Sequence, residues 1–164
     1  MRGVAMFERL GNPQRTPAEI YSSAWAKMNV GVEFAVRDCD AFYLSMIAST
    51  IDDDLASLLL LKKLKMARKL SDPVGSSEHV GMNSYVEFRF GAGSRSFRQL
   101  LHPSVCGASF ALSIASRLGA GVVGLRAGQV LLWPDEEGCL RELHVTAVVS
   151  ARNGKTHRER AGAM

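Results

Sequence analysis

The sequence predicts an α+β protein in which a short antiparallel helical hairpin precedes a mostly antiparallel β domain. Two segments with apolar residues at helical spacing lie within residues 37–70 and are joined by a short polar turn. Residues 82–150 instead contain several short runs in which apolar and polar residues alternate, as in half-buried strands. Residues 71–81, rich in glycine and serine and containing a proline, separate the two patterns and predict a linker.

The first part of the chain, residues 1–36, shows no clean helical or strand period. Pro13 and Pro17 interrupt it, and only the segment EIYSSAWAKM at 19–28 is compatible with a short helix. Because chain termini are poorly ordered unless they dock on the fold, we expect a loosely ordered N-terminal extension. We assign no chemistry to it.

The hairpin is predicted from two apolar stripes, one in each arm. Both stripes recur every three or four positions, which places their members on one helix face. The first arm covers about residues 37–50 and the second about residues 53–70. The stripes are Leu44, Ile47, Ala48 and Ile51, then Leu60, Leu64, Ala67 and Leu70. The leucine face of the second arm is too broad to be covered by the first arm alone. We therefore expect it to dock also on the rest of the protein or on another chain.

The β domain is predicted from four or five short strands in a compact antiparallel sheet or half-barrel. The runs are residues 85–90, 97–102, 109–114, 129–133 and 140–149. Turn-forming segments, GAGS at 91–94 and PDEEG at 134–138, separate neighbouring runs. The last residues, 151–164, are polar and basic, and we expect a disordered tail.

Composition excludes several classes of protein. The chain has 164 residues, of which 47% are apolar and 22% are charged, so it can bury a core and is not disordered as a whole. Its formal net charge of +4 is too mild to indicate DNA binding by itself. No run approaches the roughly 18 apolar residues of a membrane span, and no secretory signal is visible. We expect no membrane partner.

Three cysteines, Cys39, Cys106 and Cys139, are widely separated in the sequence. Their spacing matches neither a disulfide framework nor a metal site. The absence of a disulfide framework fits a reducing cytoplasm, so we expect a cytoplasmic protein.

An acidic cluster, Asp52, Asp53 and Asp54, marks the predicted tip of the hairpin. Grouped carboxylates on a projecting tip are suited to Mg²⁺, which prefers oxygen ligands. Helix capping is the alternative, because Asp is favoured at the N-cap and in the first helical turn. Capping is the preferred interpretation, since the basic residues at the other end of the same helix suit its C-terminus.

Those basic residues form a run at the end of the second arm: Lys62, Lys63, Lys65, Arg68 and Lys69. Such a run can contact nucleic acid or an acidic protein surface. A solvated helix face is the preferred interpretation, because no aromatic residues are interleaved for base stacking.

The chain lacks the patterns of the common catalytic sites. The histidines, at positions 79, 102, 144 and 157, form no set, and each is interpreted as a surface or edge residue. No nucleophile elbow, phosphate loop or dinucleotide fingerprint occurs. The residues alone therefore do not require an enzyme, a metal or a cofactor.

Two sequence motifs, which follow one another along residues 79–129, indicate a family. The segment 79–90 contains the pattern V-x-M-N-S-x-V-x-F, and LLHP follows at 100–103. A second pattern is matched by Ser116, Leu118, Gly119, Gly124 and Gly128, with Gln129 where aspartate is usual. In these motifs the chain resembles the C-terminal domain of the Gre-type transcription elongation factors, most of all the branch called regulator of nucleoside diphosphate kinase (Rnk). The resemblance covers about residues 35–150 with the hairpin included.

The resemblance implies an FKBP-like β domain and an N-terminal antiparallel coiled coil. It also implies one short helix near Leu118–Leu125, which the pattern alone does not predict because three glycines weaken it. It does not imply prolyl isomerase activity, since function resides in the site rather than in the fold.

For function, the resemblance implies docking of the β domain on the rim of the RNA polymerase secondary channel, which the coiled coil can enter. By resemblance, the loop around Ser116, Arg117 and Leu118 and the neighbouring strands are the candidates for binding polymerase. A structural turn with Leu118 in the core is an equally good interpretation of these residues. In the cleavage factors of the family, acidic tip residues help hold a catalytic Mg²⁺. Here an 18-residue arm spans only about 27 Å, which is shorter than a cleavage factor of the family needs to reach the polymerase active centre.

We therefore expect a non-enzymatic regulator that binds RNA polymerase and competes with transcript-cleavage factors. It needs no cofactor of its own, although its tip could approach an Mg²⁺ held by polymerase. Direct contact with nucleic acid, DNA included, is expected to be weak at most. Two alternatives stay open: a transcript-cleavage stimulator that uses Asp52, Asp53 and Asp54, and a modulator of nucleoside diphosphate kinase and nucleotide metabolism.

Overall fold

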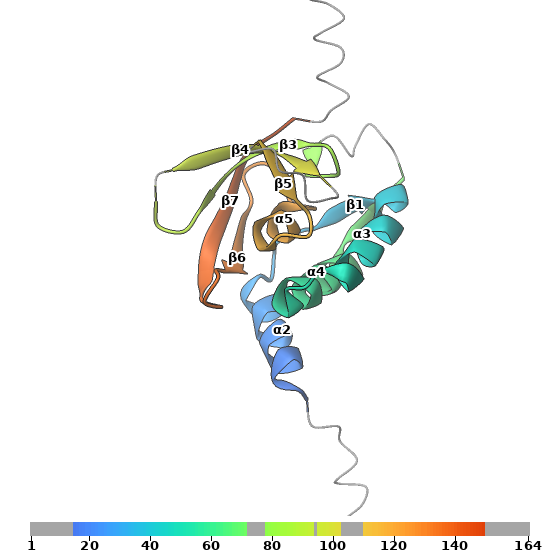
Figure 1. Ribbon diagram of the computed structural model, residues 1–164, viewed down its shortest axis with the longest axis vertical. Helices are drawn as coiled ribbons and strands as arrows, with labels where there is room; N and C mark the ends of the chain where they lie inside the picture. Colours follow the sequence, from blue (N-terminus) through green and yellow to red (C-terminus); the bar gives the residue numbers. More distant parts are fainter. Residues whose placement is uncertain (1–14, 72–77, 94, 103–109, 150–164) are drawn as a thin grey trace, which may run out of the picture.

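The structure is a computed structural model that describes residues 15–71, 78–93, 95–102 and 110–149, and the statements below concern these residues. Three helices form one side of the molecule and a five-stranded sheet with one short helix forms the other (Figure 1). The predicted tail at 151–164, most of the predicted linker, Cys106 and His157 lie outside the described residues.

The expected loose extension is wrong for its second half, which forms helix α2, Pro17–Met28. Thr16 caps this helix, and its hydroxyl accepts from the Glu19 amide while the Glu19 carboxylate accepts from the Thr16 amide. Trp25 on α2 is only 1% exposed and its indole Nε1 donates to the Leu132 carbonyl at 2.7 Å. Helix α2 is therefore held in the core rather than loosely attached.

The predicted helical pair is present as α3, Asp38–Thr50, and α4, Asp54–Met66, joined by residues 51–53. The second arm is shorter than predicted, because residues 68–70 form strand β2, Arg68–Leu70. Strand β2 pairs in parallel with β1, Ala35–Arg37. Local sequence does not end α4 at Met66; the pairing with β1 does, and it overrides helix propensity.

The sheet contains β3, Tyr85–Phe90; β4, Ser96–His102; β5, Ala111–Ser113; β6, Val130–Pro134; and β7, Leu140–Val149. Their order is β5-β4-β3-β7-β6. Three of the four pairs are antiparallel, as predicted, but β4 and β5 are parallel. Alternation of apolar residues identifies the face of a strand and not its direction, so the sequence pattern could not reveal this exception.

The helix that the resemblance implied is α5, Arg117–Val122. Its glycines allow a close approach to neighbouring backbone and rings. A Cβ at Gly119 would lie 1.8 Å from the Ser113 carbonyl oxygen, and one at Gly121 would lie 2.9 Å from Trp133 and Leu143 side chains. The residues that weaken α5 as an isolated helix are those that let it pack against the sheet.

Helix α4 packs against α5, so one continuous core joins the helical pair and the sheet domain. The end of the predicted linker belongs to this core as well. Val80 is buried, and it exchanges backbone hydrogen bonds with Leu125 at 2.7 Å and Gly124 at 2.8 Å. The helical pair thus lies along the sheet domain and does not project from it as a free arm (Figure 1). The coiled-coil and FKBP-like details stay predictions.

Candidate functional site

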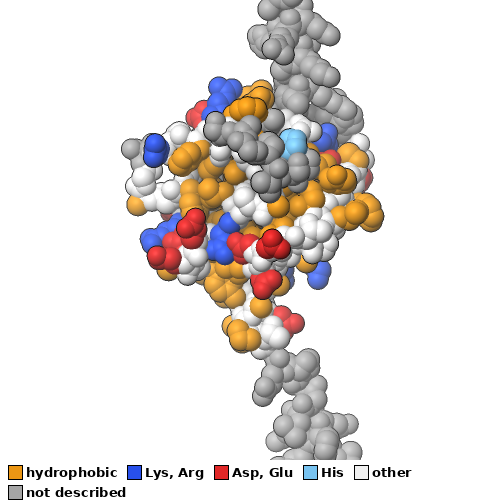
Figure 2. Space-filling view, in the orientation of Figure 1, with side chains coloured by type: hydrophobic (Ala, Val, Ile, Leu, Met, Phe, Trp, Pro, Cys, Tyr) orange, Lys and Arg blue, Asp and Glu red, His pale blue; other side chains and the backbone are white. Residues whose placement is uncertain are grey.

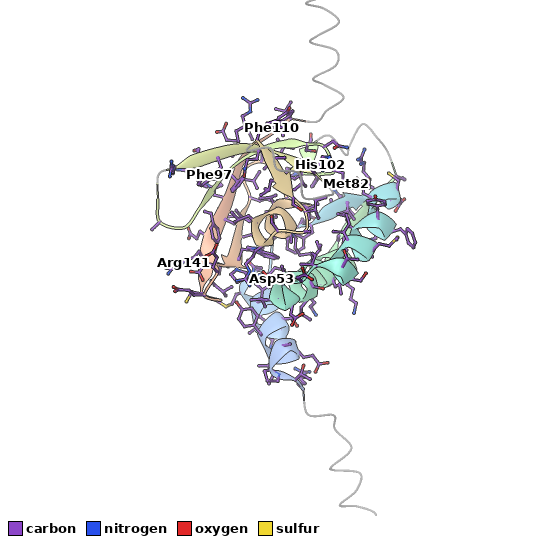
Figure 3. All side chains as sticks on the ribbon, in the orientation of Figure 1. Asp53, Met82, Phe97, His102, Phe110 and Arg141 are labelled. Carbon is purple, nitrogen blue, oxygen red and sulfur yellow. The ribbon has the colours of Figure 1, made fainter. Side chains whose placement is uncertain are left out.

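Two groups of residues that the sequence placed in separate predictions meet in one ion pair. Asp53 precedes α4, and Arg117 begins α5. The Arg117 guanidinium donates from Nε to Asp53 Oδ2 at 2.7 Å and from Nη2 to Asp53 Oδ1 at 2.9 Å. This bidentate geometry is the strongest that arginine forms with a carboxylate. Figure 3 labels Asp53 at this junction of the helical pair and the sheet domain.

Further bonds fix both partners of the pair. Asp53 Oδ1 accepts from the Ala56 amide at 3.1 Å, so Asp53 is the N-cap of α4. Arg117 Nη1 donates to the Asp135 carbonyl, and the Arg117 carbonyl accepts from Trp133 Nε1 at 2.8 Å. The hydrogen bond from Arg117 holds the pKa of the Asp53 carboxyl below its ordinary value, and the same bond raises the pKa of Arg117. Both groups are charged at neutral pH.

The other two residues of the acidic tip behave differently. Asp52 and Asp54 are exposed, and among the described residues their side chains have no hydrogen-bond partner. The three tip carboxylates also do not gather their oxygens at one point, as the ligands of a preformed metal site would. The capping alternative therefore accounts for Asp53, and its carboxylate is not at a projecting tip. A catalytic role for the exposed pair stays a prediction.

Ser116 and Leu118 flank the arginine and have distinct structural roles. Ser116 is the N-cap of α5, with Oγ accepting from the Gly119 amide at 3.0 Å and donating to the Ser113 carbonyl at 2.6 Å. Leu118 is half-buried and packs against the core. Capping thus occupies the serine hydroxyl, while the exposed part of Leu118 is available to a partner.

An open groove of about 730 Å³ runs beside these residues. Its apolar part comes from Phe90, Leu112, Leu118 and Pro134, and its polar part from Gln99, Ser116, Arg117, Asp135, Glu136 and Glu137. Figure 2 shows acidic and basic side chains intermingled with apolar ones on this side of the molecule. A mixed rim around an apolar floor is suited to a protein surface.

The basic run is only partly a solvated face, because Lys63 is buried. Its ammonium donates to three carbonyls at the end of α5: Ala120 at 2.9 Å, Gly121 at 2.7 Å and Val123 at 2.6 Å. The Phe34 and Trp133 rings each lie 5.3 Å from the nitrogen. Burial lowers the pKa of Lys63, but a neutral amine has only two N–H groups, so three simultaneous bonds need the charged form.

Among the residues that the structure describes, the histidines do not form a catalytic set. His144 Nδ1 lies 3.1 Å from an Arg89 guanidinium nitrogen, and Figure 3 places His102 away from Asp53. His79 was predicted as a surface or edge residue; it is instead buried, at 7% exposure, and its backbone forms an isolated bridge with Arg126.

One group of potential metal ligands occurs among the described residues: Asp135, Glu137 and Cys139. The spacing of the cysteines in the sequence had not predicted a metal site at Cys139. The Asp135 carboxylate, however, already accepts from the amides of Glu137 and Cys139 and from Arg141 Nε. These bonds explain the cluster as the closure of the β6–β7 turn, and the cluster alone does not indicate a metal. Within the described ranges, no helix is long and apolar enough to cross a membrane.

Comparison with known proteins finds a solved structure with a similar fold. No family model matches the chain, and no curated protein matches it. Among solved structures, the prokaryotic transcription elongation factor GreA/GreB from Nitrosomonas europaea is 24% identical and superimposes with a TM-score of 0.54. That match covers 71% of this chain and 98% of the other. GreA factor homolog 1 (Gfh1) of Thermus thermophilus is 21% identical, with a TM-score of 0.35 over 71% of this chain and 98% of the other. The first similarity shows that this chain shares the fold of a solved Gre-type factor.

Proposed function

We propose that this protein is a Gre-type transcription regulator that binds RNA polymerase at the secondary channel and has no strong transcript-cleavage activity of its own. The observation that carries the proposal is the bidentate Asp53–Arg117 pair, which ties the hairpin tip to the sheet domain of a Gre-like fold. We further propose that the chain belongs to the Rnk branch of the family and that it competes with cleavage factors. It would do so in the cytoplasm, where polymerase acts.

The length of the helical pair supports a regulator over a cleavage factor. Helices α3 and α4 have 13 residues each, which corresponds to about 20 Å at 1.5 Å per residue. The pair also packs along the sheet domain. An arm of this length and placement is poorly suited to deliver a carboxylate deep into a channel.

The state of the tip carboxylates supports the same conclusion. Asp53 is neutralised by Arg117 and caps α4, so recruiting it for Mg²⁺ would break three hydrogen bonds. Of the three tip carboxylates, only those of Asp52 and Asp54 are exposed and have no hydrogen-bond partner among the described residues. Their exposure is the observation that favours the second candidate function, stimulation of transcript cleavage.

Polymerase binding is assigned to the groove beside Ser116, Arg117 and Leu118. The test is a pull-down of core RNA polymerase with the full chain, with a Gre cleavage factor added as competitor. We expect binding at micromolar protein that the competitor displaces. Absence of binding at that concentration would refute the proposed function.

A matched pair of charge reversals locates the binding surface. Glu137 is exposed and lines the groove, whereas Glu142 is exposed on β7 outside it. We expect Glu137→Lys to weaken binding to polymerase and Glu142→Lys to leave it unchanged. Equal effects of the two variants would show that the groove is not the docking surface.

The cleavage alternative is tested with stalled elongation complexes. We expect the wild-type chain to release no more short RNA than polymerase alone. Strong cleavage that the double variant Asp52→Asn/Asp54→Asn abolishes would establish the alternative. Asp53 is left intact in this variant because changing it would also remove the α4 cap and the bond to Arg117.

A further inference from the structure

A second site, independent of the proposed function, lies where β2 meets the start of the sheet domain. A groove of about 440 Å³ is lined there by Arg68, Lys69, Leu70, Ser71, Glu78, His79 and Arg126. Three of these side chains are basic and two more, Ser71 and His79, can donate hydrogen bonds. The volume lies within the range of small-ligand pockets.

The buried member of the groove has an unused polar atom. His79 is 7% exposed, and its Nδ1 is buried without a hydrogen-bond partner among the described residues. Buried polar atoms in folded proteins almost always have a partner, so an orphan of this kind indicates a group that binds there. The backbone of His79 is fixed by a bridge to Arg126, which brings both residues to the same groove.

The two guanidiniums beside the ring are also uncommitted. Neither the Arg68 nor the Arg126 side chain has a hydrogen-bond or ion-pair partner among the described residues. Burial is the main cause that lowers the pKa of His79, and the positive charges of Arg126 and Arg68 lower it further, against the opposite effects of Glu78 and Glu33. The positive charges of both arginines therefore reach the imidazole, where they disfavour its protonated form. The same charges would attract an anion in the groove.

We propose that Arg68, Arg126 and His79 form a binding site for a small phosphate-bearing ligand, either free phosphate or the terminal phosphate of a nucleotide. Two guanidiniums offer forked N–H donors that match phosphate oxygens, and the Nδ1–H tautomer of His79 supplies another donor. Lys69 contributes positive charge, while its Nζ already donates to the Leu64 carbonyl at 3.1 Å.

The shape of the charge favours a small ligand over a nucleic-acid backbone. Three basic side chains line one groove of about 440 Å³, a size that suits one small phosphate-bearing ligand rather than a continuous nucleic-acid backbone. The competing explanation for Nδ1 is a water. His79 also lines, with Arg37 and Asp40, a void of about 10 Å³ that has room for about one water molecule.

The test is a titration of the full chain with inorganic phosphate, at ionic strength held constant with chloride, monitored by NMR of the histidine ring nitrogens. We expect a saturable change at His79 and none at His144, which is bonded to Arg89. A change at neither ring, or one that does not saturate, would overturn the site and leave the water as the partner of Nδ1.

Variants provide a second, independent readout by calorimetry. We expect Arg126→Gln to weaken phosphate binding about tenfold or more, because a charge-assisted bond to the ligand is lost. Arg98→Gln, on an exposed residue of β4 outside the groove, is the matched control and should bind as the wild type does. Equal affinities for Arg126→Gln and the wild type would refute the proposal.

The source of the phosphate is decided by comparing three probes. A nucleoside diphosphate that binds more tightly than phosphate, with the same loss in Arg126→Gln, identifies a nucleotide. Equal affinity identifies free phosphate. If a single-stranded RNA oligonucleotide displaces phosphate more strongly than the nucleotide does, the groove binds a nucleic-acid backbone and the small-ligand proposal is wrong. None of these readouts involves polymerase, so their failure leaves the proposed function untouched.

Discussion

Replacing Lys63 with methionine should destabilise the contact between α4 and α5 while keeping the packing of the side-chain stem. The ammonium donates to the Ala120, Gly121 and Val123 carbonyls from a fully buried position. Methionine fills a similar apolar volume but cannot donate, so three carbonyls at the end of α5 lose their partner. The change therefore isolates the polar contribution of this contact.

The expected cost follows from the geometry. A hydrogen bond to a charged group contributes about 1.5–3 kcal/mol, and an unpaired buried carbonyl costs about 1–3 kcal/mol. Three bonds to one nitrogen are not additive, and the variant no longer has to desolvate an ammonium. We therefore expect a loss of about 3–5 kcal/mol of unfolding free energy, in line with the breaking of other buried charged contacts. For a chain of this size, that lowers Tm by about 6–20 °C.

The measurement is thermal and urea unfolding followed by circular dichroism at pH 7. Lys65→Met is the matched control, because Lys65 is exposed on the same helix and surface changes of this kind stay within about 0.5 kcal/mol. A Lys63→Met variant as stable as the control would show that the three carbonyls find water or other donors. In that case the contact would not hold α4 to α5.

Three further changes test other parts of the fold. Gly119→Ala should lower the free energy of unfolding in urea by about 3 kcal/mol or more, because its Cβ would overlap the Ser113 carbonyl. Gly138→Ala, at φ +85 with open space around it, should lower it by about 1 kcal/mol, and equal losses would contradict the close packing of α5. Trp25→Phe should lose about 1–2 kcal/mol in the same assay, because the indole hydrogen bond to the Leu132 carbonyl and part of the buried ring volume are lost, although Asn29 Nδ2 still donates to that carbonyl. No loss would mean that α2 is not integral to the core. The depressed pKa of Asp53 implies that its stabilising effect is complete above the ordinary value of 3.8 and is lost as the pH falls from there through the lowered folded value. Asp53→Asn, which keeps an N-cap residue, should flatten this part of the stability–pH curve, and an unchanged curve would refute the assignment.

Much of the architecture could be predicted because it follows from the spacing of apolar residues along the sequence. The two helical arms and the strands of the sheet follow apolar residues at spacings of three to four or of two, and both kinds of element are present. Strand β2 could not be predicted, because its pairing with β1 depends on a partner more than thirty residues away in the chain. Helix α2 was predictable in principle, since Thr16-Pro-Ala-Glu19 is a capping box with proline at the first helical position.

The candidate sites were harder to predict, since they depend on contacts between distant segments. Asp53 and Arg117 were each singled out, but no spacing connects residues 64 positions apart. The basic run concealed Lys63, although Leu59 four positions before it and Leu60 three positions before it place it on the buried stripe of α4. For His79, the surrounding glycine, serine and proline indicated a linker, whereas its bridge to Arg126 joins residues 47 positions apart, which no local pattern reveals.

The departures from local sequence rules converge on α5. A six-residue helix with two glycines has little intrinsic stability, yet it is capped by Ser116 at one end and by the buried Lys63 ammonium at the other. Its first residue, Arg117, is bonded to Asp53 at the start of α4 and borders the groove that we propose as the docking surface. Natural sequences give up local consistency mainly where function or assembly requires it. The same short helix thus supports both the docking of the helical pair and the proposed binding surface, which explains why its residues satisfy their neighbours rather than helix propensity.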